Sequence, residues 1–157
     1  AMEITLTEEE VRIGRYIASQ KRNLSKRNEY RELKRDGRSH LEIMVQGLTA
    51  ELAVAKALNI YPDLDSHYSP FDLTYKGMKI NVKSTISDWN NLLIPDYQKS
   101  ESDYYILVTG TIPVLTIRGV ASSEMIYRPE NLVDLGKGVS YMLKQAQLIP
   151  FWDWLNA

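Results

Sequence analysis

The segment "SPFDLTYKGMKINVKST", residues 69–85, decides how this chain folds. Apolar and polar residues alternate on both sides of Lys76-Gly77, a dipeptide typical of a tight turn. The pattern predicts a β-hairpin with strands over residues 71–75 and 78–86.

The second strand of this hairpin carries two kinds of side chain. Because successive residues of a strand point to opposite faces, Ile80 and Val82 share one face, and Asn81 and Lys83 share the other. Asp72 lies on the first strand. We therefore expect Asp72, Asn81 and Lys83 to surround one small polar patch.

Two helices are predicted before the hairpin. Thr7-x-x-Glu10 and Ser39-x-x-Glu42 are capping boxes, and apolar residues follow each of them at helical spacing. They predict helices over about residues 8–21 and 39–58.

The rest of the chain predicts an α/β domain. Residues 104–110 and 114–121 are apolar runs typical of strands, and "VSYMLKQAQLIPFWDWL" predicts a last strand and a closing helix that buries Trp152 and Trp154. Residues 87–102 are expected to form a long functional loop. We predict a central mixed sheet of about four to five strands flanked by helices.

Two parts of the chain differ in character. Residues 1–38 are expected to form a basic helical segment at the N-terminus, and residues 39–157 one globular core. A chain of 157 residues is long enough to bury such a core.

Composition narrows the function classes. The chain has no cysteine and two histidines, which excludes disulfides and thiolate metal sites and makes a histidine-rich metal site unexpected. No apolar run approaches the roughly 20 residues that span a bilayer, and the N-terminus lacks the features of a signal peptide. We expect a cytoplasmic protein with no membrane partner, in the host cell cytoplasm if it is phage-encoded.

A basic stretch indicates a polyanion partner. Residues 12–38 hold ten Lys or Arg against three acidic residues, a net charge of +7, whereas the rest of the chain carries −8. The alternative is a solvated helix face. The expected DNA-contacting residues are Lys21, Arg22, Lys26, Arg27, Arg31, Lys34, Arg35 and Arg38, together with Trp89 from the loop after the hairpin.

The polar patch has the groups that phosphodiester hydrolysis requires. A hard cation neutralises charge on the phosphate and lowers the pKa of the attacking water, and Mg²⁺ prefers oxygen ligands. The candidate ligands are Asp72, the side-chain oxygen of Asn81, the backbone carbonyl of Val82, and Glu51 from the preceding helix. Lys83 would hold the water or stabilise developing negative charge.

Glu51 is the least expected of these residues in structural terms. It lies in "GLTAELAVAKAL", the most apolar part of its helix, where an unpaired carboxylate is costly. The alternative is a partly solvated position at the edge of the buried face.

The order of these segments resembles a known family. "GLTAELAVAKAL", "PFDLTYKG", "KINVKST" and "DYYILVTG" resemble the PD-(D/E)xK nuclease superfamily, which has the restriction-endonuclease-like fold. Its members carry Glu on a helix, Asp on a strand and (Asp/Glu)-x-Lys on the next strand, with an apolar strand after it. The resemblance covers residues 47–110 and assigns catalytic roles to Glu51, Asp72, Asn81 and Lys83. It implies a Mg²⁺-dependent DNA endonuclease, with Mn²⁺ as a substitute, of the restriction, repair, phage or mobile-element type.

Asn81 departs from the family pattern, because an amide oxygen contributes no charge to a cation site. Three explanations stay open: an inactivating replacement of a natural acid, a natural variant that works with Glu51 and Asp72, or a degenerate member that only binds nucleic acid. We favour the first two together over the third.

Two other function classes compete with the nuclease. One is a catalytically silent nucleic-acid-binding module on the same fold, and the other is an interaction domain that docks through "LIPFWDWL". The presence of Glu51, Asp72 and Lys83 together favours the enzyme. Because cutting both strands of a duplex usually requires two active sites, we also expect a homodimer.

The basic segment leads to a test of DNA binding. Replacing Lys26, Arg27, Lys34 and Arg35 with neutral residues is expected to weaken binding and to reduce the slope of log affinity against log salt by about one per lost phosphate contact. The measurement is a DNA titration of both proteins at several salt concentrations. An unchanged slope would mean that the segment is only a solvated face.

Overall fold

The computed structural model describes residues 1–24, 39–62 and 72–157. Lys26, Arg27, Arg31, Lys34, Arg35 and Arg38, and the first expected strand residue, Phe71, lie outside them. The described helices are α1 (Glu8–Leu24), α2 (His40–Leu58), α3 (Ser123–Ile126) and α4 (Phe151–Leu155). The described strands are β1 (Met2–Thr5), β2 (Leu73–Tyr75), β3 (Met78–Thr85), β4 (Leu92–Pro95), β5 (Tyr104–Thr111), β6 (Val114–Ser122), β7 (Leu132–Asp134) and β8 (Val139–Leu143).

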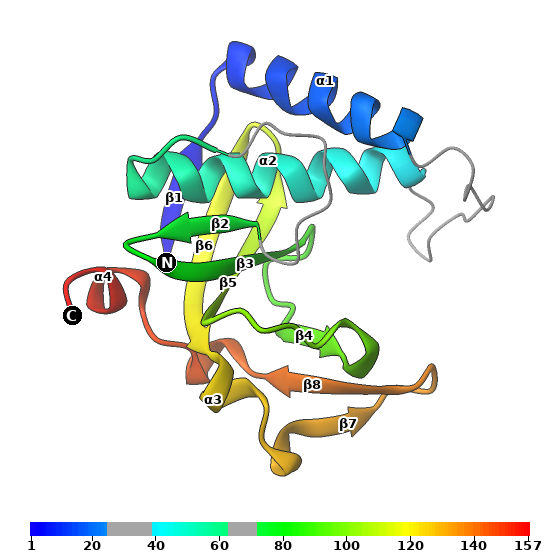
Figure 1. Cartoon of the computed structure of the whole chain (residues 1–157), viewed down its shortest axis with the longest axis vertical. Coiled ribbons are helices and arrows are strands. Elements are labelled where there is room, and N and C mark those ends of the chain that lie inside the picture. The colour runs from blue at the N-terminus through cyan, green and yellow to red at the C-terminus, as the bar shows by residue number, and fades with distance from the viewer. Residues whose placement is uncertain (25–38, 63–71) are drawn as a thin grey trace.

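The strands form two sheets. The main sheet is mixed and curled, with strand order β1-β6-β5-β3-β2, and β3 and β5 are its parallel pair. A smaller antiparallel sheet has the order β4-β8-β7. Figure 1 shows the helices α1 and α2 above the main sheet and the small sheet below it.

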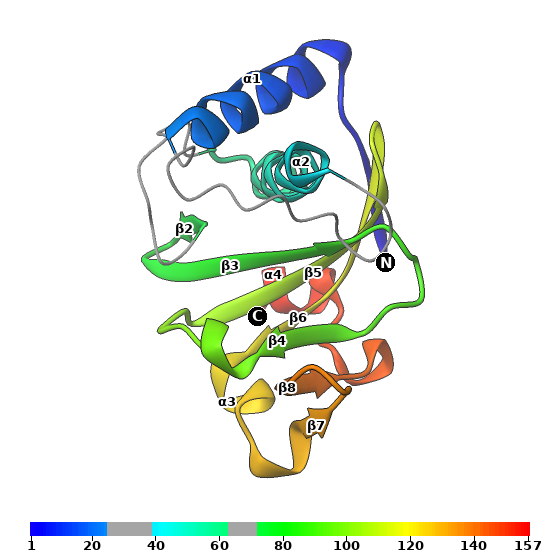
Figure 2. The ribbon, with the colours of Figure 1, turned by 90° about the vertical axis from the view of Figure 1, so that its right-hand side faces the viewer.

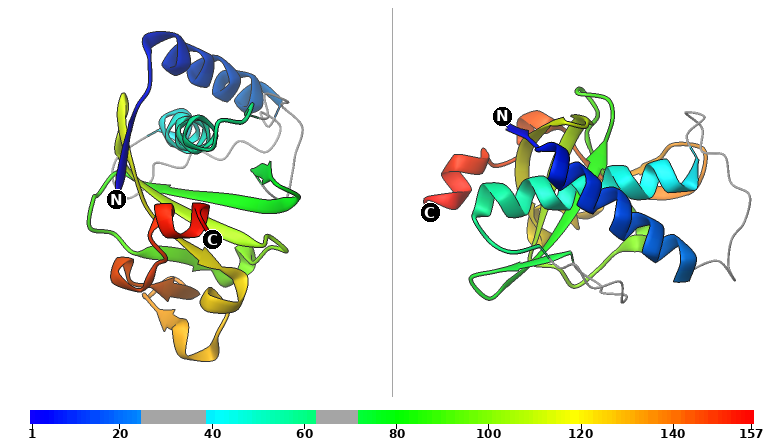
Figure 3. Two further views of the ribbon diagram at one scale, coloured as in Figure 1. Left: turned by 90° about the vertical axis from the view of Figure 1, so that its left-hand side faces the viewer. Right: turned by 90° about the horizontal axis from the view of Figure 1, so that it is seen from above.

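The layers follow from the apolar faces of the elements. α2 lies on one face of the main sheet, and α1 crosses over α2 on the outside (Figures 2 and 3). One buried cluster joins α2 to the main sheet through residues such as Val54, Ile80 and Val108. A second cluster joins Leu107 to Ile94 and thus the main sheet to the small one. The second face of the main sheet is therefore covered largely by strands, whereas the sequence suggested helices.

The local signals in the sequence explain where the elements begin and turn. Thr7 and Glu10 exchange hydrogen bonds of 3.1 and 2.7 Å as a capping box, and Ser39 Oγ accepts from the backbone N–H of Glu42 at 3.1 Å. The hairpin turns at Lys76-Gly77 as predicted. Both residues have positive φ values, 49° and 78°, which matches the twist of the strands that they join.

The sequence prediction was wrong for several short elements. The N-terminal segment supplies β1, which pairs with β6. Residues 87–102 are not one loop, because they contain β4 and the 3₁₀ turn Asp96–Gln98. In α4, Trp154 is buried, but Trp152 is 57% exposed because a helix of five residues buries only one face.

In the parts of the chain that the structure describes, no helix has both the length and the apolar character that crossing a bilayer requires.

The glycines of the hairpin and of α2 provide a paired test of this fold. Gly77→Ala places a Cβ at φ +78° and is expected to lower the free energy of unfolding by about 1–2 kcal/mol. Gly47→Ala, in the interior of α2 with no atom within 4 Å of the new Cβ, is expected to raise it by up to about 1 kcal/mol. Urea denaturation measures both. Equal stability of Gly77→Ala and the parent protein would contradict the left-handed turn.

Candidate active site

A polar cavity of about 630 Å³ lies at the edge of β3, beside the residue that precedes β2. It is lined by all of the residues that the sequence predicts for catalysis and metal binding: Glu51, Asp72, Asn81, Val82 and Lys83. Gly47, Lys79 and residues 97–102 complete the lining. The structure thus brings these side chains together, and their catalytic roles remain a prediction.

Asp72 lies directly before β2, at the point where the pairing of β2 with β3 begins. Its backbone N–H donates to the carbonyl of Ile80 at 2.9 Å, which continues the ladder of β2 and β3 by one bond. Its carboxylate Oδ2 then accepts from the backbone N–H of Val82 at 2.6 Å. A carboxylate therefore occupies the place of the next strand residue and satisfies the strand edge.

This bond also fixes the direction of the Val82 carbonyl. In a β-strand the N–H and C=O of one residue point to the same side, so the carbonyl of Val82 faces the same edge as its N–H. The carbonyl oxygen of Val82 is thus a second possible metal ligand on the edge of β3 that the Asp72 carboxylate bonds.

The alternation of β3 puts the polar side chains on the predicted face. Ile80 and Val82 are buried against α2, whereas Asn81 and Lys83 are half-buried. Asn81 and Lys83 pair in register with Tyr105 and Leu107 of β5.

Lys83 is half-buried, and its amine is held by a hydrogen bond. Its Nζ donates to Gln98 Oε1 at 3.1 Å. Burial lowers the pKa of the Lys83 amine from its ordinary value, and the charge on Asp72 opposes part of that shift. Lys83 and Asp72 line the same cavity.

Glu51 enters from the helix side of the cavity. It is half-buried on α2, and Gly47, one turn earlier on the same face, leaves open space beside it. The cavity lining thus contains the carboxylates Glu51, Asp72 and Glu101, and the amines of Lys79, Lys83 and Lys99.

The wall formed by residues 97–102 was not predicted residue by residue. Ser100 anchors it, because its Oγ hydrogen-bonds Tyr105 Oη at 2.7 Å and its backbone N–H donates to Tyr127 Oη at 3.3 Å. The hydroxyls of Tyr105 and Tyr127 also bond each other, and burial, followed by this bond, raises the pKa of Tyr127. The only sequence signal for the wall was the length of the connection between two strands.

The residues expected to bind nucleic acid are only partly described. Lys21 and Arg22 lie in the last turns of α1, and the other six basic residues lie outside the described ranges. Trp89 is 82% exposed in the turn after β3 and does not line the cavity. Its turn is fixed by Gln145 Nε2, which donates to the carbonyls of Asp88 and Asn90 at 2.7 Å each.

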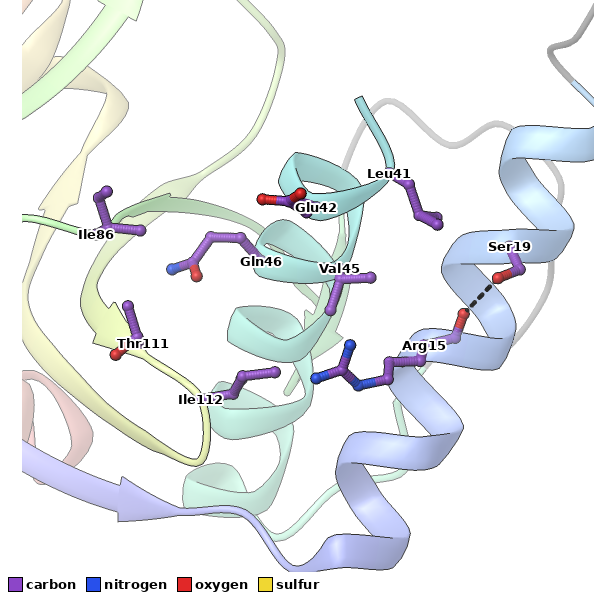
Figure 4. Close-up of a pocket in the computed structure, with 9 residues that line it drawn as sticks. All are labelled: Arg15, Ser19, Leu41, Glu42, Val45, Gln46, Ile86, Thr111 and Ile112. Atoms are coloured by element: carbon purple, nitrogen blue, oxygen red, sulfur yellow. Dashed lines mark hydrogen bonds between the residues drawn. The ribbon is translucent and has the colours of Figure 1, made fainter. Parts of the chain in front are cut away.

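A second cavity, of about 420 Å³, is different in character (Figure 4). It lies between α1, α2 and the turn joining β5 to β6, and its lining is mainly apolar, with Ile86 and Ile112 on the sheet side. Gln46 Nε2 bonds the carbonyl of Gly110 at 3.0 Å and is thereby occupied. None of the residues predicted for metal binding lines this cavity.

The polar cavity has donors that fit a hard cation. Carboxylate, amide and carbonyl oxygens are the ligands of Mg²⁺, which needs only one or two carboxylates because it keeps several waters. Within residues 1–24, 39–62 and 72–157, no group of three or more His, Cys, Asp or Glu side chains is placed to hold a metal ion. Asn81 lines the same cavity as Glu51 and Asp72.

Comparison of the chain with family models, curated proteins and solved structures gave no match in any of the three.

The setting of Lys83 predicts a pH-dependent stability. Because its pKa is lower in the folded protein than in the unfolded chain, the unfolded chain binds more protons between these two pKa values, and stability rises with pH there. Lys83→Met is therefore expected to unfold at a higher temperature than the parent protein at neutral pH in metal-free buffer. This advantage should shrink as pH rises toward the ordinary pKa of lysine.

The exposed Lys137→Met serves as the control in the same thermal denaturation series. If both variants followed the parent protein at every pH, Lys83 would carry no desolvation penalty.

Proposed function

We propose that this protein is a Mg²⁺-dependent DNA nuclease with a restriction-endonuclease-like fold. The observation that carries the proposal is that Glu51, Asp72, Val82 and Lys83 line one cavity, although they come from three separate places in the chain: α2, the residue before β2, and β3. A silent domain has no need for two carboxylates and a desolvated lysine at one strand edge.

The order of elements also supports the proposal. α2 carries Glu51, β2 is preceded directly by Asp72, β3 carries Lys83, and β5 follows as a strand whose residues 105–109 are buried. This is the order of helix, strand, strand and apolar strand on which the sequence resemblance rests.

The expected metal site would use oxygen atoms of Asp72, Glu51, Asn81 and the Val82 carbonyl. A bound Mg²⁺ would neutralise phosphate charge and lower the pKa of the attacking water, and Mn²⁺ would substitute for it.

The protein's own groups would orient the reacting atoms. The Val82 N–H fixes one oxygen of the Asp72 carboxylate, and Asp72 lines the cavity. Lys83, positioned by Gln98, would donate a hydrogen bond to the attacking water or to a phosphate oxygen. In the hydrolysis, the water oxygen bonds to phosphorus, one P–O ester bond breaks, and the departing oxygen takes up a proton.

The alternative is a catalytically silent nucleic-acid-binding module, and one observation favours it. Asn81 brings no charge to the position where the family pattern has an acid, so we expect a reduced affinity for a divalent cation. Asn81 either replaces a natural acid or is the natural residue of a working enzyme. In both cases, placing a carboxylate at position 81 distinguishes a nuclease from a silent binding module.

DNA is the proposed partner in both cases, through the basic segment that ends at Arg38. For an enzyme that cuts duplex DNA, a homodimer would supply the second active site.

The central test adds one charge at position 81. Asn81→Asp is nearly isosteric, and two unit charges 4 Å apart interact by about 4 kcal/mol near a protein surface. A third of this figure is about tenfold in affinity, so the variant is expected to bind Mn²⁺ or Mg²⁺ at least about tenfold more tightly and to cleave plasmid DNA faster. Metal titration calorimetry and a plasmid nicking assay measure the two effects.

Two further variants make this test specific. Asn156→Asp adds the same charge at an exposed position after α4 and is expected to change neither property. Lys83→Ala in the Asn81→Asp background should abolish cleavage and keep DNA binding. No gain in metal affinity, with no cleavage by any variant, would favour the silent module.

A further inference from the structure

Tyr97 is an aromatic side chain at the mouth of the polar cavity. It lines the cavity and is nevertheless 80% exposed. The 3₁₀ turn Asp96–Gln98, which carries it, has no buried residue, so the ring contributes little to the core. The next residue, Gln98, bonds the amine of Lys83.

The turn that carries Tyr97 is joined to a fixed wall. Lys99 Nζ lies 4.8 Å from the centre of the Tyr127 ring, and Ser100 bonds the hydroxyls of both Tyr105 and Tyr127. Ser102 is buried and accepts a hydrogen bond from Ser123 through its carbonyl. An exposed ring on such a wall loses little freedom when it binds a flat partner.

We propose that Tyr97 stacks on a nucleobase and that the cavity takes an unpaired nucleotide. The inference rests on the proposed function, because it assigns the phosphate of that nucleotide to the cavity that holds Lys83. An exposed aromatic ring beside positively charged groups is how proteins bind single strands with little regard to sequence.

The unpaired state follows from the geometry of stacking. In a duplex, both faces of an internal base are covered by its neighbours, so a side chain can stack only on a terminal or unpaired base. The ring faces of single-stranded DNA are open, and stacking on one aromatic side chain strengthens its binding about 5- to 100-fold. The substrate class is therefore single-stranded DNA or the unpaired part of a branched or overhanging end.

The test uses a fluorescein-labelled 12-nucleotide single strand of mixed sequence and a blunt duplex of the same sequence, both in EDTA. Tyr97→Ala is expected to bind the single strand about 5- to 100-fold more weakly than the parent protein, with a much smaller change for the duplex. Tyr97→Phe and Tyr97→Trp keep a ring and should keep the affinity. Tyr61→Ala is the matched control, because Tyr61 is 98% exposed and does not line the cavity.

Three results would overturn the inference. They are no binding of the single strand by the parent protein, equal losses for Tyr97→Ala and Tyr61→Ala, or equal losses of single-strand and duplex binding in Tyr97→Ala. Because EDTA removes catalysis from the measurement, the binding result can be read whether or not the protein cleaves DNA. If Tyr97→Ala weakens single-strand binding but Asn81→Asp does not cleave DNA, only the nuclease proposal is rejected. If Asn81→Asp cleaves DNA but Tyr97→Ala binds the single strand as the parent protein does, only the stacking proposal is rejected.

Discussion

The bond between the Asp72 carboxylate and the backbone N–H of Val82 determines how the candidate site is arranged. Among the described residues, β2 pairs with β3 from Leu73 to Tyr75, and the N–H of Val82, beyond Ile80 on the edge of β3, requires another acceptor. A side chain supplies it, so the strand edge is satisfied without being covered. A cavity can therefore open beside a strand whose other neighbours are firmly packed.

Placing Lys83 in this cavity lowers the stability of the fold, although the proposed chemistry requires a lysine there. Lys83 is half-buried beside that edge, where burial disfavours its charged form. A protein selected only for stability would place an apolar side chain there. The neighbouring strand β5 offsets this loss of stability, because its residues 105–109 are all buried. Tyr105 and Leu107 belong to one apolar cluster, and Ile106 and Val108 belong to the other.

The sequence predicted the parts of the fold that depend on local signals. The capping boxes, the Lys76-Gly77 turn and the alternation along β3 are local, and they lead directly to α1, α2 and the face that holds Lys83. The short strands β1 and β4 were missed because each is defined by a partner distant in the sequence. β7 pairs with the adjacent strand β8 and was missed because its three residues are too few to show an alternating pattern. The wall of the site was missed for a reason similar to that for β1 and β4, since Ser100 is held by the hydroxyl of Tyr127, 27 residues later, as well as by that of Tyr105.

The pairing of β4 with β8 also bears on when the site can form during synthesis. β4 leads into the cavity wall, and its partner β8 (Val139–Leu143) follows every strand of the main sheet in the sequence. On a ribosome, the hairpin with Asp72 and Lys83 emerges long before that partner. The Asp72 carboxylate and the Lys83 amine therefore face a completed wall only after β8 has been synthesised.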